Sequence, residues 1–265
     1  MTSKTHLTRI ITPLNEKGGV GKTCSTLNLG AALSLLGKKV LLIDFDPAAK
    51  LTKYCGVDPK RLDKSIYQVA IGQARPQDVV IHLPKFDLLP ANRDLSGAIE
   101  DFVLMRERKG IFGEEILKIQ LQEFMQDYDY VLIDTMPTYN KLETCALIAS
   151  TEVFIVIEPE YFSVDGVSEL LETISDVQSA SNPALQITGA FVTKMHFGFG
   201  GHKGFSKYVK DSLGDIVFDT RIGTCREIAD STGNHKDIFD YKKSCRGARD
   251  YMALAQEIVK QERHP

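Results

Sequence analysis

The chain has 265 residues, with 43% hydrophobic and 25% charged side chains, which suits a globular protein with a substantial core. A net charge of −3 excludes a protein that is basic overall and binds nucleic acid through its whole surface. Five scattered cysteines without a CxxC pair argue against a disulfide framework or a zinc knuckle, and no apolar run approaches the roughly 18 residues of a membrane span. We therefore expect a cytoplasmic protein.

Short apolar runs alternate with longer amphipathic stretches along the chain. Nearly continuous apolar runs are typical of strands covered on both faces, and they predict strands at residues 9–14, 39–45, 87–90, 130–134, 153–157 and 187–193. Amphipathic periodicity predicts helices at residues 22–36, 113–126, 140–149, 164–180 and 247–261. This alternation implies a parallel sheet with right-handed crossovers. We predict one doubly wound α/β domain over residues 1–265, a P-loop NTPase with a mainly parallel sheet, helices on both faces and a polar extension at residues 1–8.

A glycine-rich segment joins the first predicted strand to the first predicted helix. Its glycines let backbone N–H groups approach phosphate oxygens, and the helix N-terminus adds free N–H groups and partial positive charge. Lys22 is expected to reach the β- and γ-phosphates of ATP, the Thr23 hydroxyl to bind Mg²⁺ and the Cys24 N–H to meet the α-phosphate. The usual G-x-x-x-x-G-K-T pattern is altered, because Glu16 replaces its first glycine and Lys17 follows. The predicted nucleotide contacts of this segment are Lys17, Gly18, Gly19, Val20, Gly21, Lys22, Thr23 and Cys24.

Two acidic strand ends are candidates for the groups that hold Mg²⁺ and position water beside a phosphate loop. Strand alternation places Asp44 and Asp46 on one side, at the carboxyl edge of the sheet, where doubly wound folds bind ligands. Asp46 is expected to lie at the metal and to orient the attacking water or accept its proton, with a loop-capping role as the alternative. Asp44 is the less favoured of the two. Asp134 ends the run YVLID and is expected to act on Mg²⁺ through water.

Six segments together resemble the ParA/Soj group of deviant Walker A ATPases, in the same superfamily as MinD. They are EKGGVGKT, LIDFDPAA, DLLPANRDLSG, YDYVLIDTMP, IEPEYFSVDGVSELLETI and RGARDYMALAQEIV. The resemblance implies that Lys17 is the signature lysine, which reaches the partner subunit's phosphates in an ATP-bound homodimer. It also implies that Lys22 is the phosphate lysine, Thr23 the Mg²⁺ threonine, Asp46 the water-positioning aspartate and Asp134 the Walker B aspartate.

The resemblance further implies a Mg²⁺-dependent ATPase in the cytoplasm, at the nucleoid, with ATP and Mg²⁺ as cofactors. Such proteins dimerise with ATP, bind double-stranded DNA nonspecifically and partition plasmids or chromosomes. A ParB-like centromere-binding protein or a cargo adaptor stimulates their hydrolysis. No membrane partner is expected, because the residues after Glu257 offer few apolar anchors.

Basic residues are in slight excess in the last part of the chain, with 13 Lys and Arg against 10 Asp and Glu from Lys194 onward. In the resembled family, basic residues of this part face DNA, whereas a solvated face is the alternative. The predicted DNA contacts are Arg221, Arg226, Lys242, Lys243 and Arg246.

Departures from the family pattern limit the assignment of the base-binding residues. Ala48 and Met136 stand where the family commonly has Gln and Pro, and residues 219–223 replace its usual prolyl-arginyl segment near the base. The adenine contacts are therefore assigned only to Lys194 and Met195. Residues 196–202, rich in glycine and histidine, favour a flexible surface loop.

Several functions remain as alternatives to DNA partition. One is an ATPase of the same group that positions a protein cargo, and another is a metabolic P-loop enzyme, such as a small-molecule kinase or an ATP-dependent ligase. A MinD-like regulator and a nucleotide binder without hydrolysis are further alternatives. An iron–sulfur relative would use Cys145, but the apolar helical pattern TCALIAS favours a core position for this residue.

Overall fold

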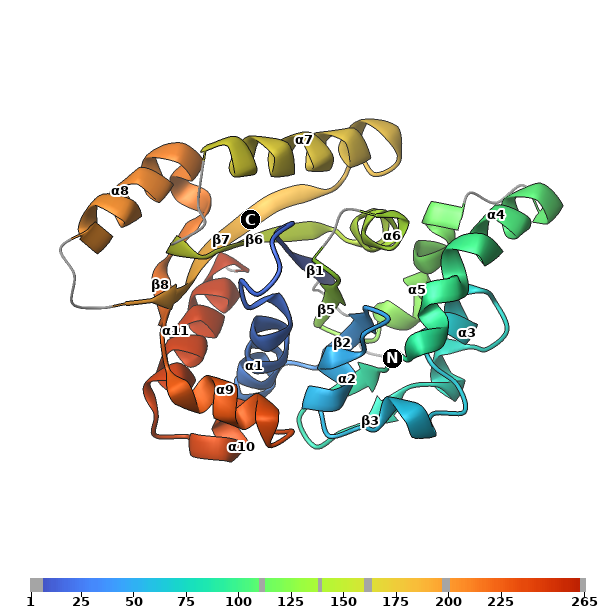
Figure 1. Ribbon diagram of the computed structural model, residues 1–265, viewed down its shortest axis with the longest axis horizontal. Coiled ribbons are helices and arrows are strands. Elements are labelled where there is room, and N and C mark those ends of the chain that lie inside the picture. Colours follow the sequence, from blue (N-terminus) through green and yellow to red (C-terminus); the bar gives the residue numbers. More distant parts are fainter. Residues whose placement is uncertain (1–6, 110–112, 138–139, 160–163, 197–200, 263–265) are drawn as a thin grey trace.

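The computed structural model describes residues 7–109, 113–137, 140–159, 164–196 and 201–262. Within them the chain forms an eight-stranded sheet in the order β3-β4-β2-β5-β1-β6-β7-β8 (Figure 1). The strands are β1 (Arg9–Leu14), β2 (Val40–Phe45), β3 (Ile81–His82), β4 (Asp87–Leu89), β5 (Tyr130–Thr135), β6 (Glu152–Ile157), β7 (Gln186–Met195) and β8 (Val217–Gly223). Among these strands only the β3–β4 pair is antiparallel, so the predicted mainly parallel sheet is confirmed.

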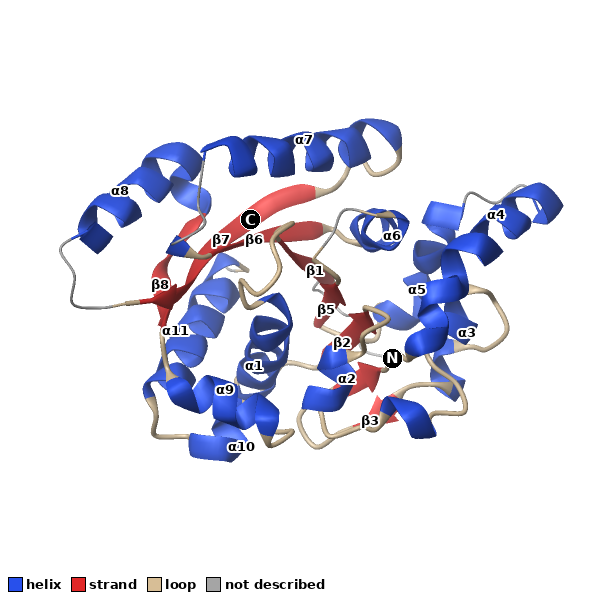
Figure 2. Cartoon of the chain, in the orientation of Figure 1, coloured by secondary structure: helices blue, strands red, loops and turns tan. Residues whose placement is uncertain are grey.

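Helices cover both faces of the sheet, as predicted (Figures 1 and 2). One face carries α1 (Lys22–Leu35), α9 (Arg226–Gly233), α10 (Ile238–Lys242) and α11 (Arg246–Gln261). The other carries α3 (Ile66–Ala70), α4 (Ala98–Lys109), α5 (Ile116–Met125), α6 (Lys141–Ala149), α7 (Val164–Ala180) and α8 (Gly201–Leu213). The short helix α2 (Lys50–Tyr54) follows β2 and lies beside α1. No helix in the described segments is both long and apolar enough to cross a bilayer.

The side chains of β2 explain why its sequence is apolar without alternation. Leu42 packs with α1 and α11 on one face, whereas Leu41 and Ile43 pack with the helices of the opposite face. All six residues of β2 are buried. A strand covered on both sides favours a continuous apolar run, as in Val40–Ile43, and this run is the signal in the sequence.

The two strands that the sequence did not predict lie at the edges of the sheet. The centre of β8 is polar, and the backbone N–H groups of Asp219 and Thr220 donate to the carboxylate of Glu257 in α11. An edge strand has a free side where polar residues reach solvent, so its sequence lacks the continuous apolar run. β3 spans two residues, too few for any periodicity.

The helices that the sequence missed are α2, α3, α4, α8, α9 and α10. In the segment expected to be a flexible loop, α8 begins at Gly201, His196 is exposed and residues 197–200 lie outside the described residues. The expectation of a loop therefore fails from residue 201 onward. Glycines at 201 and 204 obscured a helix that packs through Val209.

The strand order brings three loops together at one edge of the sheet. β1 lies between β5 and β6, and β2 pairs with the other side of β5. In this register Asp44 of β2 lies directly opposite Asp134 of β5. The carboxyl ends of parallel strands share an edge, so the segments after β1, β2 and β5 meet where ligands bind in doubly wound folds.

Candidate nucleotide-binding site

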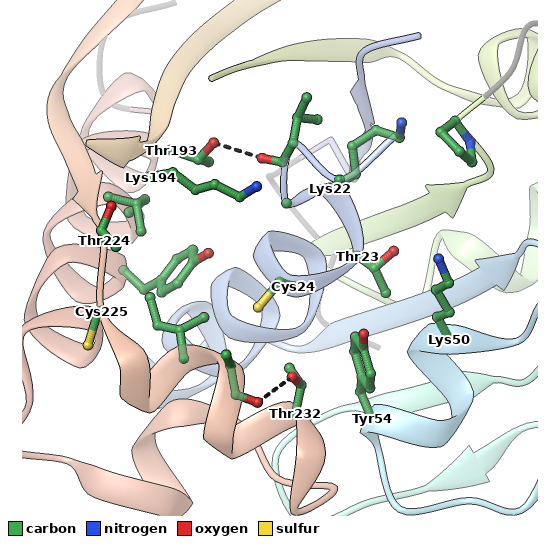
Figure 3. A pocket seen from close by; sticks show the side chains of 18 of the residues that line it. Lys22, Thr23, Cys24, Lys50, Tyr54, Thr193, Lys194, Thr224, Cys225 and Thr232 are labelled. Atoms are coloured by element: carbon green, nitrogen blue, oxygen red, sulfur yellow. Dashed lines mark hydrogen bonds between the residues drawn. The ribbon is translucent and has the colours of Figure 1, made fainter. Parts of the chain in front are cut away.

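The loop between β1 and α1 has the backbone of an anion-binding turn. Gly19 and Gly21 have φ angles of 85° and 98°, which glycine adopts without steric cost. Gly21 precedes α1 as its N-cap and supplies no side chain, so the first N–H groups of the helix remain available to a ligand. The Thr193 hydroxyl donates to the carbonyl oxygen of Val20 at 2.7 Å and ties the loop to β7 (Figure 3). The loop is thus held in a shape that suits phosphate oxygens.

Lys22 is a buried lysine at the first position of α1. Its side chain is 5% exposed, and its Nζ donates to the carbonyl oxygen of Asn15. Burial lowers the pKa of Lys22, while the charges of Asp134, Glu143 and Asp46 oppose this change and the charge of Lys50 adds to it. The ammonium group therefore lies where acidic strand ends converge, beside the open N–H groups of the loop.

The two acids at the end of β2 have different surroundings. Asp44 is fully buried, and its carboxylate accepts bonds from the Thr52 N–H and hydroxyl at 2.8 and 2.7 Å. Burial raises the pKa of Asp44 to about 7. Asp46 lines a cavity at the sheet edge, and its Oδ1 accepts the Ala48 N–H at 2.8 Å. Asp44 thus fastens β2 to α2, and Asp46 alone of the two faces the space where a ligand binds.

Asp134 and Thr23 form the part of the site that suits a divalent cation. Asp134 is fully buried, and its Oδ2 has no hydrogen-bond partner among the residues that the structure describes. Burial and the nearby Asp44 raise the pKa of Asp134, while its interaction with the Thr23 side chain lowers it. Mg²⁺ prefers oxygen ligands and keeps several waters, so a hydroxyl beside an unpartnered carboxylate oxygen fits this ion. Within the described residues no group of three or more His, Cys, Asp or Glu side chains is arranged to hold a metal ion.

A cavity of about 530 Å³ lies over the phosphate loop (Figure 3). Of the residues predicted to bind nucleotide or metal, it is lined by Gly19, Val20, Gly21, Lys22, Thr23, Cys24, Asp46 and Lys194. Lys194 has a φ of 51°, and its Nζ forms an ion pair with Glu158 at 2.9 Å. Lys17, Gly18, Met195 and Asp134 do not line this cavity. Lys17 is exposed at the loop. Met195 is buried in the cluster that α7 and α8 form with the sheet.

The far wall of the cavity comes mostly from residues that the sequence did not assign to the nucleotide, although it includes Ile222 and Gly223 of the segment 219–223, where the family has residues near the base. It is formed by Lys50, Tyr54, Thr193, Ile222, Gly223, Thr224, Cys225, Ile228, Ala229, Thr232 and Tyr251. These residues belong to α2, the ends of β7 and β8, the connection from β8 to α9, α9 and α11. Its largely apolar side chains suit the flat face of a base. No spacing in the sequence marks them, because most lie some 200 residues from the phosphate loop.

Three of the five predicted DNA-contacting residues form ion pairs with carboxylates. Arg226 pairs with Asp230 at 3.5 Å, and Lys242 of α10 pairs with Glu227 of α9 at 2.7 Å. Arg246 pairs with Asp250 at 3.4 Å, and Arg221 is half-buried in the edge strand β8. Lys243 is exposed at the end of α10. Nearby carboxylates therefore neutralise part of the positive charge of these Lys and Arg side chains.

Glu143 is a buried acid beside the phosphate loop that the sequence did not single out. It lies in the first turn of α6 and is 0% exposed, and within the described part of the chain neither carboxyl oxygen has a hydrogen-bond partner. Burial raises its pKa to about 7, with Lys22 opposing the rise and Glu16 adding to it. An unpartnered buried carboxylate is costly, so the fold favours the neutral acid.

Replacing Glu143 with Gln is expected to change how stability depends on pH. An unfolded glutamate titrates near 4.5 and the folded one near 7, so wild-type stability falls as pH rises through this window. From pH 5 to pH 8, the stability of Glu143→Gln should therefore improve relative to wild type by about 2 to 3 kcal/mol. Urea denaturation at both pH values measures this change. An equal difference at the two pH values would show that the charge of Glu143 is not the cause.

Comparison with known proteins agrees with this geometry. A family profile described as an AAA domain matches residues 8–187. The chain is 38% identical over 248 residues to the chromosome-partitioning ATPase Soj of Treponema pallidum (strain Nichols), covering 93% of this chain and 95% of that protein. The chain belongs to the ParA/Soj family of P-loop ATPases. This ParA/Soj protein is also 32% identical to the chromosome partitioning protein ParA of Caulobacter vibrioides (strain NA1000 / CB15N), covering 96% and 95% of the two chains.

A solved structure shares the whole fold of this ParA/Soj chain. The crystal structure of cobyrinic acid a,c-diamide synthase from Mycobacterium smegmatis, with bound ADP and magnesium, superposes with a TM-score of 0.82 at 30% identity. The match covers 97% of this chain and 96% of that chain. The doubly wound P-loop architecture thus extends over nearly the full length of both.

Proposed function

We propose that this ParA/Soj-family ATPase forms an ATP-bound homodimer, binds double-stranded DNA nonspecifically and partitions a plasmid or chromosome. A ParB-like partner stimulates hydrolysis and thereby releases the dimer. The observation that carries the proposal is the convergence of the Lys17-bearing phosphate loop, Asp46 and Asp134 at one edge of the sheet, in a chain related over its full length to partition ATPases.

Different residues of the proposed site have different roles in ATP hydrolysis. The loop N–H groups and Lys22 bind the phosphates, while Thr23 and, through water, Asp134 would hold Mg²⁺, with Asp46 nearby. The ion would supply positive charge that neutralises the phosphate oxygens. Asp46 orients a water that attacks the γ-phosphorus and accepts its proton, as the bond from that phosphorus to the β–γ bridging oxygen breaks. ADP and inorganic phosphate are the products.

Dimerisation and nucleotide state are linked through Lys17. This residue lies on the exposed surface of the loop, where a second subunit has access to it. From there its ammonium group reaches the phosphates bound by the partner and supplies positive charge as the phosphoryl group transfers. Loss of the γ-phosphate removes this bridge, so the ATP-bound dimer gives way to monomers.

The test combines ATP turnover with retention on nonspecific double-stranded DNA. The proposal predicts slow hydrolysis, retention with ATP but not ADP, and loss of retention as salt rises, because phosphate contacts release counterions. Hydrolysis without DNA retention at low salt would argue against partition by DNA binding. This result would favour an ATPase that positions a protein cargo without binding DNA.

Lys243→Glu is expected to weaken DNA binding while leaving ATP turnover unchanged. Lys243 is exposed at the end of α10, so reversing its charge adds repulsion to a phosphate backbone without disturbing the core. The affinity should fall several-fold at low salt, and the slope of log affinity against log salt should decrease by about 1. Lys118→Glu in α5, on the opposite face of the sheet, is the control. Equal effects of the two substitutions would show that the surface around Lys243 is not the DNA-binding surface.

A metabolic activity is the second candidate, because the superposed Mycobacterium smegmatis structure is described as a cobyrinic acid a,c-diamide synthase. A synthase of this kind should turn over ATP faster when its acid substrate and an amide donor are supplied. Cobyrinic acid with glutamine or ammonia is therefore added to the ATPase assay. Unchanged turnover, together with stimulation by DNA and a ParB-like partner, would support partition.

A further inference from the structure

Lys50 is placed beside Asp46 by a tightly bonded turn. The Ala48 and Ala49 N–H groups donate to the Oδ1 and carbonyl oxygen of Asp46, each at 2.8 Å. Ala49 has a φ of 52°, an uncommon conformation for a residue other than glycine. The Lys53 Nζ donates to the Ala48 carbonyl oxygen at 2.7 Å and secures the turn from the other side. The backbone at Lys50 is therefore fixed relative to Asp46.

The side chain of Lys50 extends into the nucleotide cavity. It lines the cavity wall, and Figure 3 shows its amine directed toward the Thr23 hydroxyl. Its charge contributes to lowering the pKa of Lys22. Two lysines that repel each other across a cavity favour a polyanion between them, because the ligand removes the repulsion.

The other cations of the cavity wall already have partners. Lys194 is paired with Glu158, Arg226 with Asp230, and the Lys22 Nζ donates to the Asn15 carbonyl oxygen. Lys50 forms no hydrogen bond or ion pair with another residue in the described part of the chain. Its ammonium group is therefore available to a ligand without breaking an existing interaction.

We propose that Lys50 binds the γ-phosphate of ATP within its own subunit and makes the site prefer ATP to ADP. The inference rests on the proposed nucleotide function and adds a contact to it. In the proposed function, Thr23 would hold Mg²⁺ and Asp46 orients the attacking water, so both border the position of the terminal phosphate. Lys50 lines the same cavity, with its amine near the Thr23 hydroxyl (Figure 3). ADP has no group at that position, so the contact is specific to the triphosphate. A charge-assisted hydrogen bond of this kind is among the stronger polar contacts.

The experiment compares the affinities of AMPPNP and ADP, both with Mg²⁺, in wild type and Lys50→Gln by isothermal titration calorimetry. The substitution should weaken AMPPNP binding about tenfold, as expected for one charge-assisted bond, and change ADP binding by less than about twofold. Lys50→Arg keeps the charge and should restore most of the preference. The measurements are repeated in a Lys17→Ala background, so that dimerisation does not contribute to the AMPPNP affinity.

Lys53→Gln is the matched control, because it removes a charge from the same helix and a bond to the same turn but no charge from the cavity. Its ratio of AMPPNP to ADP affinity should equal that of wild type. Equal losses for both nucleotides in Lys50→Gln, no loss, or the same change in Lys53→Gln would overturn the inference while leaving the proposed function intact. A wild-type protein that binds neither nucleotide would overturn both.

Discussion

Replacing Asp46 with Ala is expected to reduce ATP turnover at least about 100-fold while ATP binding is largely retained. Asp46 faces the cavity beside the phosphate loop, whereas the proposed phosphate contacts come from the loop and Lys22. The substitution therefore removes the group that orients water and accepts its proton, not the binding site. Phosphate release in saturating Mg²⁺ and ATP measures turnover, and displacement of a fluorescent nucleotide measures binding.

Asp46→Asn separates the chemical role from the structural one. Its amide oxygen can still accept the Ala48 N–H, so the turn after β2 is kept, but the amide is a poor proton acceptor. We expect this variant to be as slow as Asp46→Ala and to remain on DNA in ATP. Wild-type turnover by Asp46→Asn would show that Asp46 only holds the turn, which is the capping role that the sequence left open.

Replacing Lys17 with Ala is expected to abolish the ATP-dependent dimer while the monomer still folds and binds nucleotide. The Lys17 backbone N–H donates to the Asn15 side chain at 2.8 Å, and an alanine at this position keeps that hydrogen bond of the loop. Truncation removes the charge proposed to reach the partner's phosphates. Light scattering after gel filtration, with ATP or ADP, measures the mass.

Lys60→Ala provides the control for Lys17, because Lys60 is exposed and lies outside the nucleotide cavity. It should dimerise with ATP as wild type does. A dimer of Lys17→Ala that forms with ATP at the wild-type protein concentration would contradict the role of Lys17 in the partner subunit. ATP binding by the Lys17 variant must be confirmed in the same samples, so that loss of nucleotide is not mistaken for loss of the dimer.

Much of the fold and the chemical centre of the site could be predicted from sequence, because their signals are local. Strands β2 and β5 are buried at every position and begin with four consecutive apolar or aromatic residues, since both faces are covered. A loop of glycines followed by Lys22 and Thr23 needs no distant residue to be recognised. Asp46 and Asp134 were found because they end such strands, and parallel strands bring their carboxyl ends to one edge. The ParA/Soj family was likewise evident from motifs along the chain and is shown by its relatives.

Only the tertiary structure distinguished residues that look alike in the sequence. Asp44 and Asp46 are two residues apart in the sequence. The Asp44 carboxylate accepts two hydrogen bonds from Thr52, whereas Asp46 faces the cavity. Glu143 reads as an ordinary helical glutamate, but the packing of α6 buries it near Lys22, whose charge acts on its pKa. The cavity wall from Ile222 to Thr232 depends on how β8 and α9 fold back over α1. Burial and charge pairing arise from contacts between distant segments, so they are decided by topology and not by the local pattern that the sequence displays.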